Sequence, residues 1–296
     1  MNYKIIIWGL GNIYNKHVNL VKYFEMNNQI EVVALTATSI PDFSYVDGYP
    51  LISPNEISDI YYDYIIVMND KHFENIVIDA IKYGVLREQI LPYRILEIPF
   101  LDFREYIKLK KSNISIISNN CWGGAVYHTL GLECQSPFKN LFVNDEDYIK
   151  LLQKLDYYML CELKLDHYDI DVHSNQRYPV MLLDNIYVHC NHDNNPDEVI
   201  KKWNRRKLKL NYNNLFVEMY TENKEIANDF LKLNQYIKKI CFVPFDNSSK
   251  ELIQLKSYPG QKEFHEVVNS NARIGNNSLD YKIVDLLNGK VINRSK

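Results

Sequence analysis

The sequence of 296 residues contains little cysteine, and its five cysteines follow no paired spacing. They are scattered, odd in number and form no C-x-x-C motif: Cys121, Cys134, Cys161, Cys190 and Cys241. Disulfide frameworks and thiolate zinc sites require regular cysteine spacing, so this pattern indicates reduced thiols and a cytoplasmic protein. A chain of this length buries enough apolar surface to fold without disulfides or structural metals.

Long apolar runs and an excess of basic charge are also missing. Lys and Arg number 34 against 37 Asp and Glu, and the formal net charge of −3 gives no electrostatic footprint for nucleic acid. No apolar run approaches the ~20 residues that span a bilayer. Only four apolar residues precede Gly9, too few for the core of a signal peptide. We therefore expect a small-molecule or glycan ligand, no nucleic acid and no transmembrane segment.

What the sequence does contain is a regular alternation of strand and helix patterns. In the first third, apolar strand patterns alternate with helical ones at residues 5–8, 12–26, 30–35, 64–68 and 70–82. Ser53-Pro54-Asn55-Glu56 adds a capping-box helix start. This alternation is typical of a parallel sheet covered by helices. It predicts an α/β fold that begins with a Rossmann-like N-terminal domain over residues 1–105.

A second alternation follows a stretch that holds Pro92, Pro99 and a charged, helical segment. Strand and helix patterns resume at residues 114–117, 121–130, 141–143, 144–155, 186–189, 195–208, 215–219, 222–233 and 240–245. The run of alternating acids at 166–173 is expected to form an exposed loop. These patterns predict a larger three-layer α/β C-terminal domain over residues 106–296.

The first glycine loop has half of a dinucleotide-binding fingerprint. Gly9, Gly11 and Asn12 follow a strand and open a helix, where glycines let the backbone approach a phosphate. Tyr14 occupies the third glycine position, and residues 34–38 lack the acid that would bind a ribose. The loop therefore disfavours NAD. It leaves open a nucleotide-type ligand or a simple strand-to-helix turn, and it identifies no cofactor.

The loop that follows the strand at 114–117 is the most informative stretch. It joins small polar residues, a cysteine, a tryptophan and two glycines before a helix: Ser118, Asn119, Asn120, Cys121, Trp122, Gly123 and Gly124. Backbone N–H groups at a helix start can hold an anion, and the polar side chains add donors, so these residues are predicted to bind substrate. A cysteine at a helix start would have a lowered thiol pKa, as a nucleophilic cysteine requires, which makes Cys121 a candidate nucleophile. Alternatively, Cys121 is a buried small hydrophobe and the asparagines are caps.

Two further motifs hold candidate functional residues. A helix from Pro196 ends in a basic cluster around Trp203, Arg205 and Arg206, which either complements the helix dipole or clamps a phosphate. His189 and His192 lie where a strand ends and are candidate general bases; a metal-ligating pair or a polar capping loop are the alternatives.

The chain also resembles known bacterial proteins. Its first ninety residues resemble the Rossmann-like modules that are fused to bacterial glycan-modifying transferases, through residues 3–11, 47–50 and 53–54. A more specific resemblance rests on ordered motifs at 118–128, 131–133, 136–138, 202–207 and 214–216. Through these, residues 114–245 resemble a bacterial exopolysaccharide-biosynthesis family of unknown function, DUF1919. The resemblance implies a context, cell-surface polysaccharide assembly, and supplies no catalytic residues.

Three functions remain open on these grounds. The first is a transferase that acts on a nucleotide sugar or phosphorylated glycan, with the 118–124 loop and the arginines on phosphate and a histidine as base. The second is a non-catalytic nucleotide- or sugar-binding scaffold. The third is a metal-dependent hydrolase built on His189 and His192.

Overall fold

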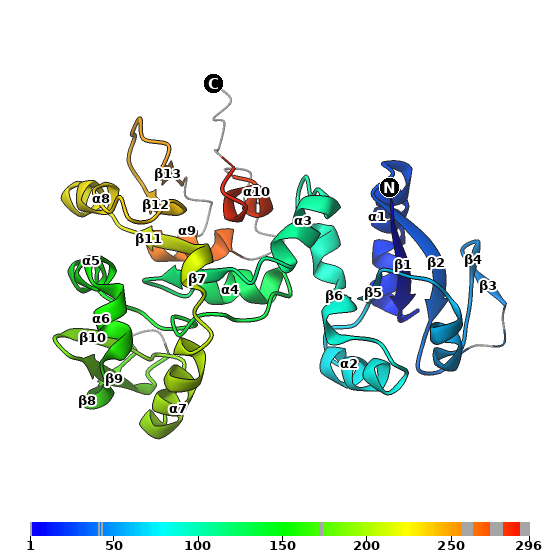
Figure 1. The fold of residues 1–296 in the computed structure, drawn as a ribbon, viewed down its shortest axis with the longest axis horizontal. Coiled ribbons are helices and arrows are strands. Elements are labelled where there is room, and N and C mark those ends of the chain that lie inside the picture. The colour runs from blue at the N-terminus through cyan, green and yellow to red at the C-terminus, as the bar shows by residue number, and fades with distance from the viewer. Residues whose placement is uncertain are drawn as a thin grey trace. The chain divides into compact units, whose positions relative to one another are not determined.

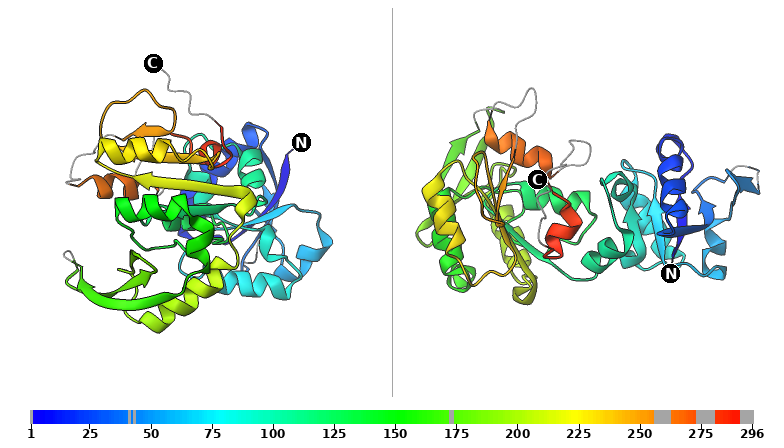
Figure 2. Two further views of the ribbon diagram at one scale, coloured as in Figure 1. Left: turned by 60° about the vertical axis from the view of Figure 1, so that its left-hand side comes forward. Right: turned by 90° about the horizontal axis from the view of Figure 1, so that it is seen from above.

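The computed structural model describes residues 2–40, 42, 44–171, 174–255, 263–272 and 281–290. The chain divides into two compact units, Met1–Tyr106 and Ile107–Lys296, and each contains its own parallel sheet with helices (Figures 1 and 2). The expected α/β fold class with two domains is therefore confirmed.

The first unit is built on a four-stranded parallel sheet in the order β2-β1-β5-β6. The strands are β1 (Tyr3–Trp8), β2 (Ile30–Thr36), β5 (Tyr64–Val67) and β6 (Ile90–Pro92). Helix α1 (Asn12–Met26) follows β1, and α2 (Phe73–Lys82) follows β5. The predicted helix at 12–26 is confirmed. The start at Ser53 produces a 3₁₀ segment of two turns, η1 (Pro54–Asp59), and the chain extends again at Ile60.

Two layers of apolar side chains cover the sheet of the first unit. One layer includes Ile6, Trp8 and Val67 and packs against η1 and α2. The opposite face lies toward α1, which packs against the 3₁₀ segment η3 (Tyr93–Glu97). The minor elements are a short hairpin, β3 (Tyr45–Val46) with β4 (Tyr49–Pro50), and η2 (Arg87–Gln89).

The second unit contains a parallel sheet in the order β13-β12-β11-β7. Its strands are β7 (Ser115–Ser118), β11 (Leu215–Tyr220), β12 (Lys239–Val243) and β13 (Leu252–Gln254). Side chains alternate between the two faces of a strand. On one face Trp122 of α4 (Trp122–Thr129) stacks on Phe216 and contacts Phe242, and α9 (Phe264–Asn271) packs beside α4. Helices α5 (Asp145–Gln153) and α8 (Lys224–Leu231) pack together over Val217 and Met219 on the other face.

A three-stranded antiparallel sheet, in the order β10-β9-β8, interrupts the alternation. It consists of β8 (Leu163–Ile170), β9 (Arg177–Leu183) and β10 (Ile186–His189). The prediction of a loop at 166–173 was wrong for residues 166–170, and Val172 and His173 lie outside the described residues. Strand β8 is an edge strand with mostly exposed side chains, so its polar sequence looks like that of a loop. The strand expected at 141–143 forms a single bridge, between Phe142 and His189.

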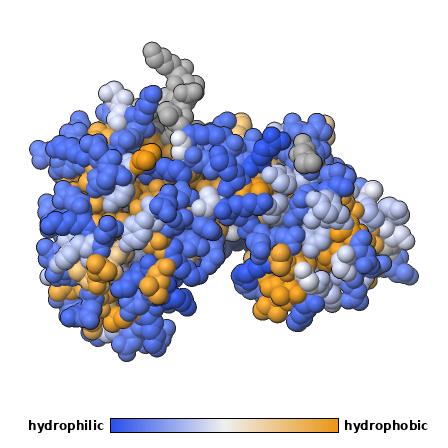
Figure 3. All heavy atoms as spheres, in the orientation of Figure 1, coloured by the Kyte–Doolittle hydropathy of each residue, from blue (hydrophilic) through white to orange (hydrophobic). Residues whose placement is uncertain are grey.

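The remaining elements of the second unit are helical. They are α6 (Leu155–Leu160), α7 (Pro196–Lys207), η4 (Tyr212–Asn214) and α10 (Ile283–Leu287), and α3 (Phe103–Lys110) begins in the first unit and ends in the second. No helix among the described residues is long and apolar enough to cross a membrane. The visible surface is mainly hydrophilic, and apolar side chains appear in separate patches, one of them over α2 (Figure 3).

Candidate functional site

A cysteine–histidine pair lies at the carboxyl edge of the second unit's parallel sheet. Cys121 follows β7, precedes α4 and is partly exposed. Its Sγ lies 3.1 Å from Nε2 of His192, a residue 71 positions later in the chain. An imidazole nitrogen at this distance can accept the thiol proton and leave a thiolate, which is the reactive form of cysteine. The structure therefore brings together two of the three predicted catalytic residues.

The loop between β10 and α7 holds His192 in place. The amide of Asp193 donates to the carbonyl oxygen of Cys190 at 2.9 Å, and the Asp193 carboxylate forms an ion pair with Lys202 of α7. The side chain of Asn195 caps α7 by accepting from the amide of Asp197 at 2.9 Å. Asp193 therefore pairs with Lys202, and Asn195 is the residue that caps α7.

His189 has a different environment from His192. It is the last residue of β10, and its ring lies 5.6 Å from that of Phe142. Its Nδ1 lies 3.4 Å from the hydroxyl of Tyr178, which donates to Asp169 at 3.4 Å. Burial lowers the pKa of His189, so the neutral ring is favoured. Of the two predicted histidines, His192 contacts the thiol of Cys121 and His189 contacts Tyr178.

The polar side chains next to Cys121 point into the protein. Ser118 and Asn119 are fully buried, and Asn120 is 4% exposed. The Asn120 Oδ1 accepts from the amide of Trp122 at 2.6 Å, and Ser118 Oγ accepts from the amide of Gly123 at 3.1 Å. These two N–H groups at the start of α4 are already satisfied inside the protein, and so they are not available to an anion.

The remaining predicted substrate-binding residues of this loop are also internal. Asn119 forms two hydrogen bonds with the backbone of Tyr220, both 3.2 Å long. Trp122 is fully buried, and Gly123 and Gly124 are buried where α4 approaches its neighbours. The structure gives these residues a supporting role around Cys121, and a direct contact with substrate stays a prediction.

Sequence reasoning missed an acidic side chain beneath this loop. Glu218 of β11 is completely buried, and both of its carboxyl oxygens accept from the amide nitrogen of Asn120, at 3.1 and 3.2 Å. Ser118 is also hydrogen-bonded to this carboxyl. Burial raises the pKa of Glu218 to about 8, because a charged carboxylate is disfavoured away from water. One acid inside the apolar run Leu-Phe-Val-Glu-Met-Tyr was the available signal.

The basic helix α7 separates into a core residue and surface residues. Trp203 is 2% exposed and packs edge-on against Phe138, with the ring centroids 5.4 Å apart. Arg205 is exposed and Arg206 is partly exposed, both in the last turn. They lie about 14–15 Å along the helix axis from the end of α7 that adjoins the His192 loop, at 1.5 Å per residue. Their role as a phosphate clamp stays a prediction.

The predicted cofactor-binding residues lie at the carboxyl edge of the sheet in the first unit. Gly9 has a positive φ of 114°, and a Cβ there would lie 3.3 Å from the carbonyl oxygen of Met68. Gly11 is the N-cap of α1 and has open space around it, and Asn12 begins the helix. No side chain caps this helix start. Tyr14 is buried and donates to Asp47 at 2.9 Å.

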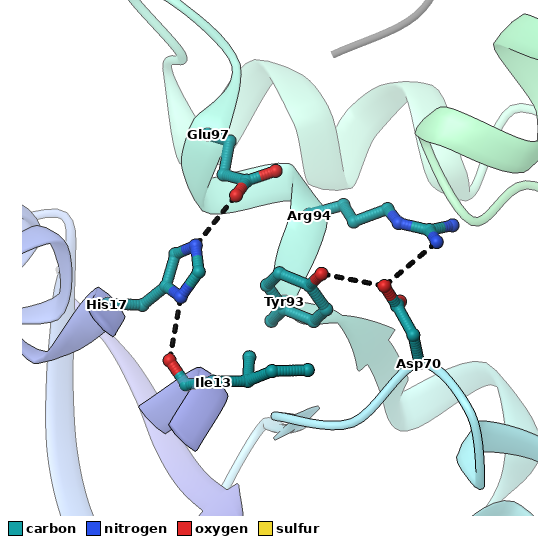
Figure 4. A network of polar contacts seen from close by, with 6 residues as sticks. All are labelled: Ile13, His17, Asp70, Tyr93, Arg94 and Glu97. Atoms are coloured by element: carbon teal, nitrogen blue, oxygen red, sulfur yellow. Dashed lines mark hydrogen bonds and ion pairs between the residues drawn. The ribbon is translucent and has the colours of Figure 1, made fainter. Parts of the chain in front are cut away.

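A network of polar side chains lies at the same edge (Figure 4). His17 of α1 contacts the carbonyl oxygen of Ile13 through Nδ1 and the carboxylate of Glu97 through Nε2, each at 2.7 Å. Tyr93 and Arg94 contact Asp70, at 2.7 and 2.9 Å. These residues join the ends of β5 and β6 to α1.

The described residues contain no group of three or more His, Cys, Asp or Glu side chains able to hold a metal ion.

Two family models match the chain, one in each part. The model described as "C2185-like, N-terminal" matches residues 1–91, and the model described as "Domain of unknown function (DUF1919)" matches residues 93–288. An uncharacterized protein of Haemophilus influenzae is 28% identical over 160 residues, which cover 54% of this chain and 70% of that protein.

A solved structure shows only slight similarity. The crystal structure of aspartate semialdehyde dehydrogenase II complexed with ASA from Vibrio cholerae shares 9% identity, over 74% of this chain and 69% of that chain. The TM-score of 0.25 is too low for an argument about fold or function. Because the DUF1919 model matches most of the chain, the protein belongs to the DUF1919 family, a domain family of unknown function.

Proposed function

We propose that this protein is a group-transfer enzyme of cell-surface polysaccharide biosynthesis, with Cys121 as nucleophile and His192 as general base. The contact of 3.1 Å between Sγ and Nε2 is the observation that supports it. Cys121 sits at the end of a parallel strand, where open α/β sheets present their ligands. The polysaccharide context comes from the sequence resemblance described above.

Acyl transfer is the chemistry that best suits this pair. A cysteine that accepts a phosphoryl group needs N–H donors around the phosphate, yet the N–H groups of Trp122 and Gly123 are already satisfied by internal side chains. Acyl transfer needs a thiolate, a base that exchanges one proton, and a donor to the developing oxyanion; the pair supplies the first two, and a group other than these two N–H groups must supply the third. We therefore propose an acyl group as the transferred group, in place of the phosphate-centred scheme predicted from sequence.

The reaction proceeds in two balanced steps. His192 takes the thiol proton, and the Cys121 sulfur attacks the carbonyl carbon of an activated ester or thioester. The new C–S bond forms, the bond to the leaving group breaks, and His192 returns the proton to the leaving group. In the second step a glycan hydroxyl, deprotonated by His192, attacks the thioester. The ester forms, the C–S bond breaks, and the proton returns to Cys121.

Acylation by p-nitrophenyl acetate tests this proposal without knowledge of the natural donor. We expect rapid release of p-nitrophenol and one acetyl group on the peptide that contains Cys121. Cys121→Ala should abolish both, and His192→Ala should slow acylation by about 10²–10⁴-fold. Cys161→Ala and His167→Ala remove another partly exposed thiol and an exposed imidazole, so they are the matched controls.

Two outcomes would contradict the assignment. Acetylation spread equally over Cys121 and Cys161 would show that Cys121 is not activated. Loss of activity in His189→Ala with full activity in His192→Ala would assign the base to the other histidine.

A second candidate function, ligand binding by the first unit, is favoured by one observation. Helix α1 has fifteen residues, no side-chain cap, no acid in its first turn and open space at Gly11. These features of a Rossmann-like unit suit an anionic, nucleotide-type ligand. The protein would then act as a sensor or scaffold of the same pathway.

A substitution at Gly11 tests this second candidate. Gly11→Asp supplies a capping carboxylate at a position with φ of −83°, which aspartate adopts without strain. We expect the variant to keep or gain thermal stability and to lose any shift produced by ADP or UDP in the wild-type protein. Equal shifts in both proteins, or none in the wild type, would refute a nucleotide site at this helix.

A further inference from the structure

Glu218 connects both hydrogen bonds that fix the start of α4. On one side, the amide of Trp122 donates to Asn120, which donates in turn to the Glu218 carboxyl. On the other side, the amide of Gly123 donates to Ser118, whose hydroxyl is hydrogen-bonded to the same carboxyl. One buried acid therefore holds two side chains that shortly precede Cys121 in the sequence and satisfy the first turn of its helix.

The surroundings of Glu218 are neutral. Asn120 and Ser118 are its hydrogen-bonding partners, and neither carries a charge. The titratable groups that feel its charge are Tyr148 of α5, Tyr220 of β11 and Cys241 of β12, and burial raises the pKa of each. They stay uncharged when Glu218 ionises.

Two observations place further ionisable groups around the reactive thiol and its turn. Tyr220 is within electrostatic reach of both Glu218 and Cys121. Asp145 of α5 contacts Asn119 at 3.4 Å, and burial raises the pKa of its carboxyl as well. Among the described residues Glu218 has no cationic hydrogen-bonding partner, so a negative charge on it is uncompensated at the base of the turn, where it opposes formation of a thiolate.

We propose that Glu218 is a positioning residue for Cys121. The Glu218 carboxyl holds the turn of the nucleophile through Asn120 and Ser118, and it limits the reactivity of the thiolate when Glu218 ionises. This rests on the proposed function in one respect, that Cys121 is the nucleophile. While Glu218 is protonated, the turn is held and Glu218 adds no negative charge to it. Because burial raises the pKa of Glu218 to about 8, its ionisation falls within the range in which the thiol is used.

The test is the pH dependence of Cys121 alkylation by iodoacetamide. The full chain reacts at pH values from 6 to 10, and mass spectrometry of the digested protein then measures alkylation of the peptide that contains Cys121. In the wild type we expect the rate to rise with pH and then to show a second ionisation near pH 8. Glu218→Gln keeps an acceptor for Asn120 and cannot ionise, so its profile should show one ionisation. The ratio of variant to wild-type rates should grow about tenfold between pH 7 and pH 9, as expected for a shift of about one pKa unit.

Several outcomes separate this inference from the proposed function. If Cys121 in the wild type reacts no faster than Cys161, the nucleophile assignment fails. If Cys121 reacts faster but Glu218→Gln has a profile of the same shape, Glu218 is structural and the inference fails while the function stands. Glu218→Ala removes the acceptor as well and should lower the rate at every pH.

A measurement on the wild-type protein covers the case in which the variant does not fold. The infrared C=O band of a buried protonated carboxyl disappears on ionisation. We expect this band to titrate at the pH of the second ionisation in the alkylation profile. A band that persists unchanged to pH 10, or none at pH 6, would overturn the proposal.

Discussion

For the substitution Gly123→Ala, helix propensity predicts a more stable protein and packing predicts a less stable one. Alanine is favoured over glycine in a helix by about 0.8–1.0 kcal/mol, so propensity alone predicts a more stable protein. The structure predicts the reverse. A Cβ at position 123 would lie 2.7 Å from Ser118 Oγ and 3.0 Å from Ile116 Cγ2, much closer than ordinary contacts.

The size of the expected loss of stability follows from the position of Ser118 and Ile116. Ser118 and Ile116 belong to β7 and are fully buried, so they have little room to move. Overpacking of this kind costs about 1–3 kcal/mol. A shift of Ser118 also weakens its hydrogen bond with the Gly123 amide, worth about 0.5–1.5 kcal/mol. After the gain in propensity, we expect a net destabilisation of about 1–3 kcal/mol.

Urea and thermal unfolding of the full chain, followed by tryptophan fluorescence, measure this change. For a unit of this size a loss of 1 kcal/mol lowers Tm by about 2–4 °C. Ala125→Gly in the same helix is the matched control, since it should lose about 1 kcal/mol from propensity alone. Ser118→Ala removes the atom with which the new Cβ collides. The loss in the double variant should therefore be smaller than the sum of the single losses.

The reasoning would be refuted by a Gly123→Ala protein that is as stable as the wild type. That result would show that β7 and α4 have room for a methyl group between them. The turn around Cys121 would then be less tightly held than the distances indicate.

Three further predictions concern pH, a buried lysine and the first unit. The pKa of Glu218 is raised from 4.5 to about 8 by folding, so its contribution to stability is complete below pH 4.5 and is lost as pH rises through 8. Urea titrations should show the wild type losing on the order of 4 kcal/mol relative to Glu218→Gln between pH 5 and pH 9. Lys239 is 5% exposed and donates to two carbonyl groups at the end of α8, at 2.9 and 3.0 Å. Lys239→Met leaves both carbonyl groups without their donor and should lower the free energy of unfolding in urea by about 2–4 kcal/mol. A variant as stable as the wild type would show that water takes the place of the ammonium group. The ring of Phe103 in α3 packs against that of Tyr3, with the centroids 5.5 Å apart. Deletion of residues 1–92 at the family boundary should expose Phe103 and cause aggregation, measured by light scattering. A monodisperse product would show that exposure of this face of α3 does not cause aggregation.

Local signals were sufficient wherever a segment is specified by its own residues. The helix at Asn12–Met26 was predicted to the residue, because a glycine turn precedes it and its apolar spacing is helical. The start of α7 follows from Asn195 and Pro196, a cap and a first-turn proline. These features involve neighbours in sequence, so one chain is enough to predict them.

Local signals failed where burial decided the outcome. Strand β8 looks like a loop because its edge position leaves polar side chains in water. The polar residues Ser118 and Asn120 suggest a ligand-binding loop, yet each satisfies a backbone amide inside the protein. Sequence does not show which way a polar side chain points.

By itself the sequence determined the α/β class, the elements with strong periodicity or caps, and the candidate residues Cys121 and His192. Only the tertiary structure decided that these two meet, that His189 has a different neighbour, and that Glu218 lies beneath the reactive turn. The physical reason is that such contacts join residues far apart in the chain, and they depend on how strands and loops pack. Hydrophobic patterns specify which faces are buried, but they do not specify which polar groups meet once those faces have packed.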